Sequence, residues 1–149
     1  MVALALFSIP ICIADWRYRR IPNIYIIFLA YPILIERVLF GVHSISIVAW
    51  ACLFAVMAWV FLRVGMGDIK LFLLVVLALN FDGMSSLLVF LVCIYFCSLA
   101  QIALMSGINF RIPRSVPLAY AIFIGTGLYL GVKNSTYLQE YADALVNSW

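Results

Sequence analysis

Six apolar runs, separated by short polar breaks, take up most of the sequence and limit the folds open to it. The runs are residues 2–14, 24–40, 45–62, 69–81, 84–105 and 116–132. The chain has 149 residues, of which 68% are hydrophobic and only 10% are charged, whereas soluble domains are about one quarter charged. Because a membrane-spanning helix needs about 20 mostly apolar residues, we expect an all-α bundle of six transmembrane helices. The short breaks predict that successive helices are antiparallel neighbours.

The six runs leave no room for a separate soluble domain. Residues 1–149 are expected to form a single membrane-embedded domain, with a core at about 1–132 and a short polar tail at 133–149. The first run is followed, not preceded, by basic residues, so we expect a transmembrane helix and not a cleaved signal peptide. Gly127 and Gly131 lie four residues apart, a spacing that predicts close helix packing inside the bundle.

Lysine and arginine residues gather in alternate connections between the runs. Of the nine in the chain, seven flank the first, third and fifth connections: Arg17, Arg19, Arg20, Arg63, Lys70, Arg111 and Arg114. The positive-inside rule places these connections in the cytoplasm, which puts the N-terminus and the C-terminal tail outside. The net charge of +3 is small and belongs mostly to these connections, so no nucleic-acid partner is expected.

Two aspartates interrupt the apolar pattern on the predicted cytoplasmic side. Asp15 ends the first run, and Asp68 comes directly before the fourth. A charged carboxylate within a bilayer is costly, so such a residue is a functional candidate. Both runs are shorter than the ~30 Å hydrocarbon core, and counted from its outer edge they end at about the same depth. We therefore expect the two carboxylates to face one another across a water-accessible cleft.

A pair of carboxylates that shares one proton has the groups needed to hydrolyse a peptide bond. One carboxylate takes a proton from water, and the other, which is protonated, donates its proton to the leaving amine. Gly65 and Gly67 bracket the turn before Asp68; they would permit unusual backbone angles and close approach of a substrate backbone. The alternative is a plain glycine-containing loop in which Asp68 caps the N-terminus of the next helix.

The cysteines give no sign of a metal site or a disulfide. Cys12, Cys52, Cys93 and Cys97 all fall inside apolar runs, without C-x-x-C spacing, and His43 lies in a different segment. Small buried hydrophobic side chains are the expected role of these cysteines. No metal ion and no cofactor are predicted.

The residues around the two aspartates resemble a known family. "GMGD" (65–68), followed by "IKL", resembles the G-x-G-D motif of intramembrane aspartyl proteases. Asp15, Arg17, Ile21, Pro22 and Asn23 resemble the D-x-R-x-x-x-I-P-N motif of the type IV prepilin peptidases, and "IPRSVPLAYAIFIG" (112–125) is similar to the entry into that family's last core helix. The resemblance runs from about residue 11 to 131 and is to the short members that serve tight-adherence (Flp-type) pili.

The resemblance implies a hydrolase of pilus assembly and protein secretion in a bacterial or archaeal cytoplasmic membrane. It would be an aspartyl endopeptidase that removes the leader peptide of prepilins or pilin-like proteins at the cytoplasmic face. Its catalytic residues would be Asp15 and Asp68, with supporting residues Gly65, Gly67, Lys70, Arg17, Pro22 and Asn23. Nothing matches the extra cytoplasmic region of the larger family members, so no methyltransferase activity is expected. The oligomeric state stays open.

Several of the supporting residues also have an expected role that does not involve the substrate. Arg17, with Arg19 and Arg20, is expected to hold the first connection against anionic lipid headgroups, or else to position a substrate carbonyl. Lys70 does not share the helix face of Asp68, and it too is expected to contact headgroups. Pro22 and Asn23 are expected to begin the second helix, where proline is well tolerated.

Two other functions are compatible with an aspartate pair in a membrane. One is a non-catalytic transporter or assembly subunit whose aspartates bind protons or ions, although the predicted site lies near one membrane face. The other is the presenilin and signal-peptide-peptidase branch, which shares G-x-G-D. In that branch a tyrosine precedes the first aspartate and a Pro-Ala-Leu motif follows later, whereas here Ala14 precedes Asp15 and "VPLAY" replaces the triplet.

The charge pattern generates a prediction for the topology. A single cysteine at position 112, in an otherwise cysteine-free chain, should resist membrane-impermeant thiol reagents in intact cells and react after the membrane is opened, because the fifth connection is predicted to be cytoplasmic. A cysteine at position 82 should react in intact cells and serves as the control. Labelling of position 112 from outside would reverse the predicted orientation.

Overall fold

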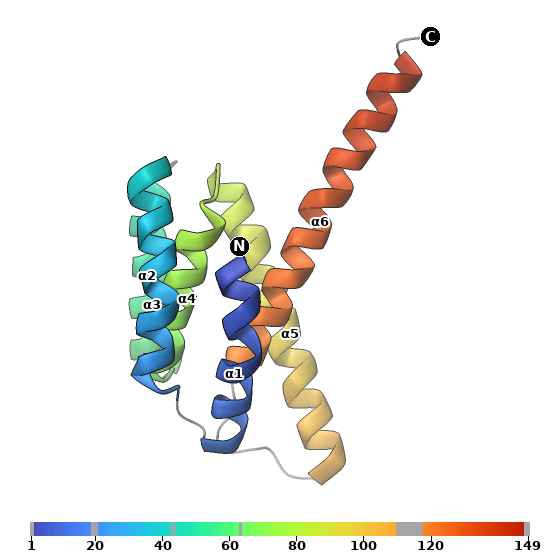
Figure 1. Ribbon diagram of the computed structural model, residues 1–149. Coiled ribbons are helices and arrows are strands. Elements are labelled where there is room, and N and C mark those ends of the chain that lie inside the picture. Colours follow the sequence, from blue (N-terminus) through green and yellow to red (C-terminus); the bar gives the residue numbers. More distant parts are fainter. Residues whose placement is uncertain (1, 19–20, 43, 63, 110–117, 148–149) are drawn as a thin grey trace.

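The computed structural model describes residues 2–18, 21–42, 44–62, 64–109 and 118–147, and within these ranges it contains six α-helices and no strand. The helices are α1 (Val2–Tyr18), α2 (Asn23–Phe40), α3 (Ile45–Leu62), α4 (Met66–Leu79), α5 (Met84–Asn109) and α6 (Leu118–Asn147) (Figure 1). The expected all-α class is confirmed, and each helix corresponds to one apolar run of the sequence.

The helices alternate in direction along the chain. The C-terminal ends of α1, α3 and α5 therefore lie at the same end of the bundle as the N-terminal ends of α2, α4 and α6 (Figure 1). Asp15 is in the last turn of α1, and Asp68 is in the first turn of α4. The fold thus brings both aspartates to the end at which the three basic connections join the helices.

Helix α4 is the central element, which the sequence did not predict. It packs against α2, α3 and α6, while α1 packs against α2 and α6. Its buried residues include Leu71, Leu74 and Val76, which point to different sides of the helix, as expected for a helix with more than one packed face. The prediction that every successive pair is adjacent holds for α1–α2, α3–α4 and α5–α6, and α4 also meets α5, where the rings of Phe72 and Phe90 stack with their centres 6.2 Å apart. Within the described residues, α2 and α3 pack against α4 and not closely against each other.

Three helices continue past the predicted ends of the apolar runs. Helix α1 continues to Tyr18 and α5 to Asn109. Helix α6 continues to Asn147, so residues 133–147 of the expected polar tail are helical, and α6 extends beyond the rest of the bundle (Figure 1). The α6 extension contains no glycine or proline, so no helix-breaking residue ends the helix where the hydropathy falls. Hydropathy therefore predicts the apolar part of a helix better than its end.

Two helices are long and apolar enough to cross a membrane within the described residues, Asn23–Phe40 and Met84–Ser106. A third apolar stretch, Ile45–Phe61, is slightly shorter. Large apolar side chains lie exposed on the outside of the bundle, for example Val38 at 83% and Ile45 at 82%. Exposed apolar surface of this extent is typical of a contact with lipid or with another protein.

Arg37 and Lys133, the two basic residues outside the connections predicted to be cytoplasmic, each have an acidic partner. The Arg37 guanidinium is 2.9 Å from Glu36 Oε1, and Lys133 Nζ is 3.2 Å from Asp82 Oδ2. Both pairs belong to the end of the bundle opposite Asp15 and Asp68. Pairing offsets the positive charge of these two residues locally, which accounts for their exception to the charge pattern.

Helices α5 and α6 pack closely at Gly125 and not at Gly127 or Gly131, the glycines predicted to provide close packing. A Cβ atom on Gly125 would lie 3.0 Å from Ile94 Cγ1 and 3.1 Å from Ile94 Cα, whereas one on Gly127 or Gly131 would meet nothing within 4 Å. The prediction that Gly127 and Gly131 serve internal packing is therefore wrong. Spacing alone does not show which face of a helix meets its neighbour.

This difference predicts opposite effects for two alanine substitutions in α6. Gly125→Ala should lower the stability by about 1–3 kcal/mol, because the new methyl group must push α6 away from the Ile94 backbone. Gly127→Ala should leave the stability unchanged or raise it slightly, since alanine favours a helix over glycine by about 0.5–1 kcal/mol. Thermal unfolding of the purified variants in detergent measures both. Equal stability of the two variants would contradict the close contact.

Candidate active site

Asp15 is one of the two buried polar or charged residues among the described part of the chain, and only 5% of it is exposed. The backbone N–H of Ala119, in the first turn of α6, donates a hydrogen bond of 3.2 Å to Asp15 Oδ2. The first N–H groups of a helix have no partner within the helix, and they carry the positive end of its dipole. The N-terminus of α6 is therefore directed at the Asp15 carboxylate.

Asp68 occupies the third position of α4 and is half-buried. The residue that caps the helix is Gly65, whose carbonyl oxygen accepts hydrogen bonds from the N–H groups of Asp68 at 3.0 Å and Ile69 at 3.2 Å. The alternative in which Asp68 is the helix cap is therefore wrong, because no side chain caps α4. Asp68 Oδ1 is buried and has no hydrogen-bond partner. Its side chain is available for another role.

Gly65 and Gly67 are required for space and not for unusual backbone angles. Gly65 has an ordinary φ of −62°, and Gly41 is the glycine with positive φ among the described residues. A Cβ on Gly65 would lie 3.1 Å from Asp68 Oδ2, and one on Gly67 would lie 3.2 Å from the Cβ of Ile21. The first glycine leaves room for the carboxylate. The second lets α4 approach Ile21, which belongs to the Asp15 motif.

The first turn of α6 connects the surroundings of the two aspartates. Ala119 donates to Asp15, and its neighbour Leu118 lines a cavity together with Asp68. The charges of Asp15 and Asp68 interact electrostatically, although α1 and α4 come from distant parts of the sequence. Sequence analysis did not find the role of Ala119, because a backbone N–H carries no sequence signal.

The supporting residues divide into those near α4 and those at the end of α1. Lys70 Nζ donates a hydrogen bond of 3.3 Å to Asn23 Oδ1, which links α4 to the start of α2. Pro22 is the N-cap residue of α2, and its carbonyl accepts from the Tyr25 N–H at 3.1 Å, as expected for a helix that begins there. Arg17 is exposed, and its guanidinium lies 5.8 Å from the centre of the Tyr18 ring. Arg19 and Arg20 lie outside the described residues.

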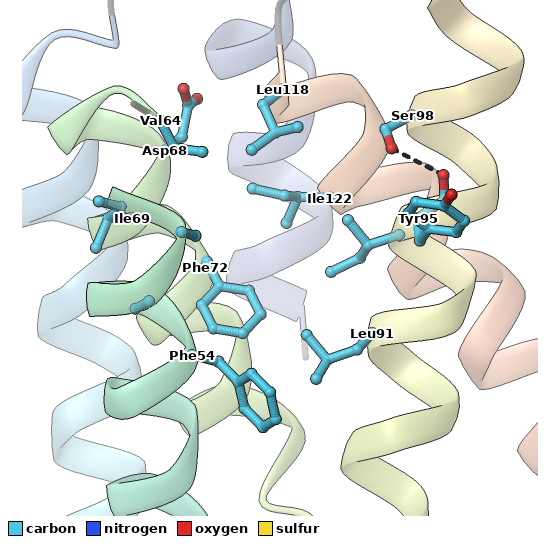
Figure 2. Close-up of a pocket in the computed structure, with 13 residues that line it drawn as sticks. Phe54, Val64, Asp68, Ile69, Phe72, Leu91, Tyr95, Ser98, Leu118 and Ile122 are labelled. Carbon is cyan, nitrogen blue, oxygen red and sulfur yellow. Dashed lines mark hydrogen bonds between the residues drawn. The ribbon is translucent and has the colours of Figure 1, made fainter. Parts of the chain in front are cut away.

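A cavity of about 230 Å³ lies beside Asp68. Helices α3 and α4 form one wall, with Phe54, Ile69 and Phe72, and helices α5 and α6 form the other, with Leu91 and Ile122 (Figure 2). Asp68 is the titratable carboxylate in the lining, and Asp15 does not line the cavity. This cavity is therefore not the water-accessible cleft that we expected both carboxylates to share. This cavity could not be predicted from the sequence, since its walls come from four helices.

The described residues contain no cluster of three or more His, Cys, Asp or Glu side chains that could hold a metal ion. The four cysteines are free thiols. No protein-family model, curated protein or solved structure matches the chain. Its function must therefore be inferred from its own residues, their geometry and the motif resemblance.

The placement of the aspartates predicts a specific cross-link. In a cysteine-free chain, Asp15→Cys combined with Asp68→Cys should be joined by a short bifunctional maleimide, because both positions lie at one end of the bundle on either side of the first turn of α6. Asp15→Cys combined with Asp82→Cys is the matched control, since Asp82 lies at the opposite end. Mass spectrometry of protease fragments identifies the linked peptides. If the Asp15→Cys/Asp68→Cys pair is not cross-linked, or if both pairs are cross-linked equally, the placement of the two aspartates at one end of the bundle is contradicted.

Proposed function

We propose that this protein is a membrane-embedded aspartyl endopeptidase that removes the leader peptide of type IV, Flp-type prepilins at the cytoplasmic face of the membrane. The observation that carries the proposal is the convergence of Asp15 and Asp68, from two separate motifs, at one end of the bundle. The resemblance of both motifs to the type IV prepilin peptidases supplies the substrate class. A bacterial or archaeal cytoplasmic membrane is the proposed location.

The proposed topology has six membrane spans with the N-terminus outside. It is supported by the two helices that are long and apolar enough to cross a membrane and by the apolar side chains on the outside of the bundle. The basic residues that flank the connections at the aspartate end favour a cytoplasmic position for that end. In this orientation the apolar helix of a prepilin would lie in the membrane while its leader reaches the aspartates from the cytoplasm.

The proposed mechanism uses one ionised and one protonated aspartate. The ionised carboxylate takes a proton from a water molecule, whose oxygen attacks the carbonyl carbon of the scissile peptide bond. The protonated carboxyl group donates its proton to the leaving nitrogen as the C–N bond breaks. The unpartnered Asp68 Oδ1 would accept a hydrogen bond from this water, and the absence of a side chain on Gly65 leaves room for the carboxylate.

A transporter with ion-binding aspartates receives less support from the side chains. Within the described residues, the buried polar or charged side chains are Asp15 and Thr126. The Thr126 hydroxyl donates to the Ile122 carbonyl at 2.7 Å, so it completes a bond inside its own helix. No series of buried polar side chains leads from Asp15 across the described bundle.

The proposal predicts that Asp15→Asn and Asp68→Asn each lower the rate of prepilin cleavage by about 10²–10⁴-fold, because asparagine serves as neither acid nor base. Both variants should stay folded, since asparagine has nearly the same shape and removes a buried charge. Purified protein is incubated with prepilin, and N-terminal sequencing identifies the product. Circular dichroism checks the fold.

Asp82→Asn is the control for these variants. Asp82 is exposed at the opposite end and contacts Lys133 at 3.2 Å, and a surface ion pair of this kind contributes about 0–1 kcal/mol. The control should cleave as fast as the unmodified protein. Near-normal cleavage by either folded Asp15 or Asp68 variant would disprove the two-aspartate mechanism, and a transporter would show no cleavage by any form.

A further inference from the structure

Asp15 and Asp68 lie in different surroundings, which favour different protonation states. The buried Asp15 accepts a hydrogen bond of 3.2 Å at Oδ2 from the backbone N–H of Ala119. Asp68 Oδ1 is also buried, but it has no hydrogen-bond partner. We propose, on the basis of the peptidase function above, that the first turn of α6 keeps Asp15 ionised, so that Asp15 is the base and Asp68 is the protonated acid. The Ala119 N–H would then be the positioning group of the reaction.

The hydrogen bond from α6 favours the charged form of Asp15. Ala119 is the second residue of α6, and the N–H of such a residue has no partner within its own helix. A hydrogen bond donated to a carboxylate is stronger than one donated to a neutral carboxyl group, so it stabilises the ionised form. The positive end of the α6 dipole acts in the same direction. Asp15 can therefore keep its charge although its side chain is buried.

The surroundings of Asp68 favour the neutral form. The N–H groups of Asp68 and Ile69, at the start of α4, both donate to the Gly65 carbonyl oxygen, and Lys70 donates to Asn23. A buried, charged oxygen without a donor is costly, and protonation of the carboxyl group lowers this cost. The negative charge of Asp15 has the same effect on Asp68, because two like charges close together disfavour each other.

The dipoles of α1 and α4 alone would give the opposite assignment. Asp15 is in the last turn of α1, where the negative end of the dipole disfavours a negative charge, and Asp68 is in the first turn of α4, where the positive end favours one. A direct hydrogen bond to a carboxylate outweighs a dipole interaction of this kind. The sequence did not predict the assignment, because the deciding hydrogen bond comes from a third helix.

This assignment gives every proton of the hydrolysis a donor and an acceptor. Asp15 takes a proton from the water molecule, whose oxygen forms a bond with the carbonyl carbon of the scissile peptide. As the C–N bond breaks, Asp68 gives its proton to the leaving nitrogen, and a carboxylic acid and an amine are released. Asp15 then holds a proton and Asp68 the negative charge. Transfer of that proton from Asp15 to Asp68 restores the starting state.

The neighbouring titratable side chains do not disturb this arrangement near neutral pH. Cys12, one turn earlier on α1, and Tyr120, next to Ala119 on α6, also interact electrostatically with Asp15. A thiol and a phenol are both neutral at about pH 6, whereas ordinary carboxyl groups are ionised there. A protonated carboxyl group detected at this pH is therefore expected to belong to the aspartate pair.

Infrared spectroscopy tests the assignment, because the C=O stretch of a protonated carboxyl group is separate from the bands of a carboxylate. At about pH 6, the purified protein in detergent should show this band. The band should remain in Asp15→Asn and be lost in Asp68→Asn. Asp82→Asn, at the opposite end of the bundle, is the matched control and should keep it. Loss of the band in Asp15→Asn, or its retention in Asp68→Asn, overturns the assignment.

A second pair of variants tests the role of α6. In the Asp68→Asn protein, Ala119→Pro removes the N–H donor, so Asp15 should take up a proton and the band should return. Proline is tolerated in the first turn of a helix, and circular dichroism checks the fold. Ala119→Val, which has similar bulk and keeps the N–H, should not restore the band. A folded Ala119→Pro variant without the band, or equal bands in both variants, overturns the role of α6; the single asparagine variants decide the assignment independently of position 119.

The possible results separate this inference from the peptidase proposal, because the band is measured without substrate. If the unmodified protein cleaves prepilin and the band is lost in Asp15→Asn, the assignment is wrong and the peptidase function stands. If the protein cleaves no prepilin, the peptidase function fails, and the catalytic roles of both aspartates fail with it. Cleavage of prepilin, together with a band that depends on Asp68 and returns in Ala119→Pro, supports the assignment.

Discussion

A carboxylate buried in an apolar bundle needs a hydrogen-bond donor, because a buried polar group without one costs several kcal/mol. Asp15 finds this donor in the backbone N–H of Ala119, at the start of α6. The bond ties the last turn of the first helix to the first turn of the last helix, which are 104 residues apart. It also sets α6 beside the cavity that Asp68 lines, through Leu118. This contact therefore helps to set the geometry of the candidate site.

The glycines of the chain act mainly by the absence of a side chain. Gly65 leaves room for the Asp68 carboxylate, Gly67 for Ile21, and Gly125 for the Ile94 backbone, each at a distance of 3.0–3.2 Å from an ideal Cβ. Two of the three contacts join segments that are far apart in the sequence. Close approach at these points brings α4 and α6 near enough to their neighbours to hold the aspartates in place.

The charges at the two ends of the bundle are arranged differently. At the end away from the aspartates, Arg37 and Lys133 each have a carboxylate partner. At the aspartate end, Arg17 is exposed, and Lys70 bonds to the neutral amide of Asn23. An excess of Lys and Arg in the connections at one end orients a membrane protein relative to the cytoplasm. The same end would then present a positive surface to anionic lipid headgroups.

The sequence by itself determined that the chain is helical, roughly where the six helices lie, and which two carboxylates interrupt the apolar pattern at one end of the bundle. These properties depend on local composition and on the alternation of short connections, both of which can be read along the chain. Only the tertiary structure decided that α4 is central, that Gly125 and not Gly127 or Gly131 meets a neighbour, and that Ala119 holds Asp15. It also decided that a cavity forms beside Asp68. Each of these features depends on which helix faces pack together. Contacts between residues far apart in the sequence decide this, because the helices are apolar on every side and the apolar pattern does not distinguish one face from another.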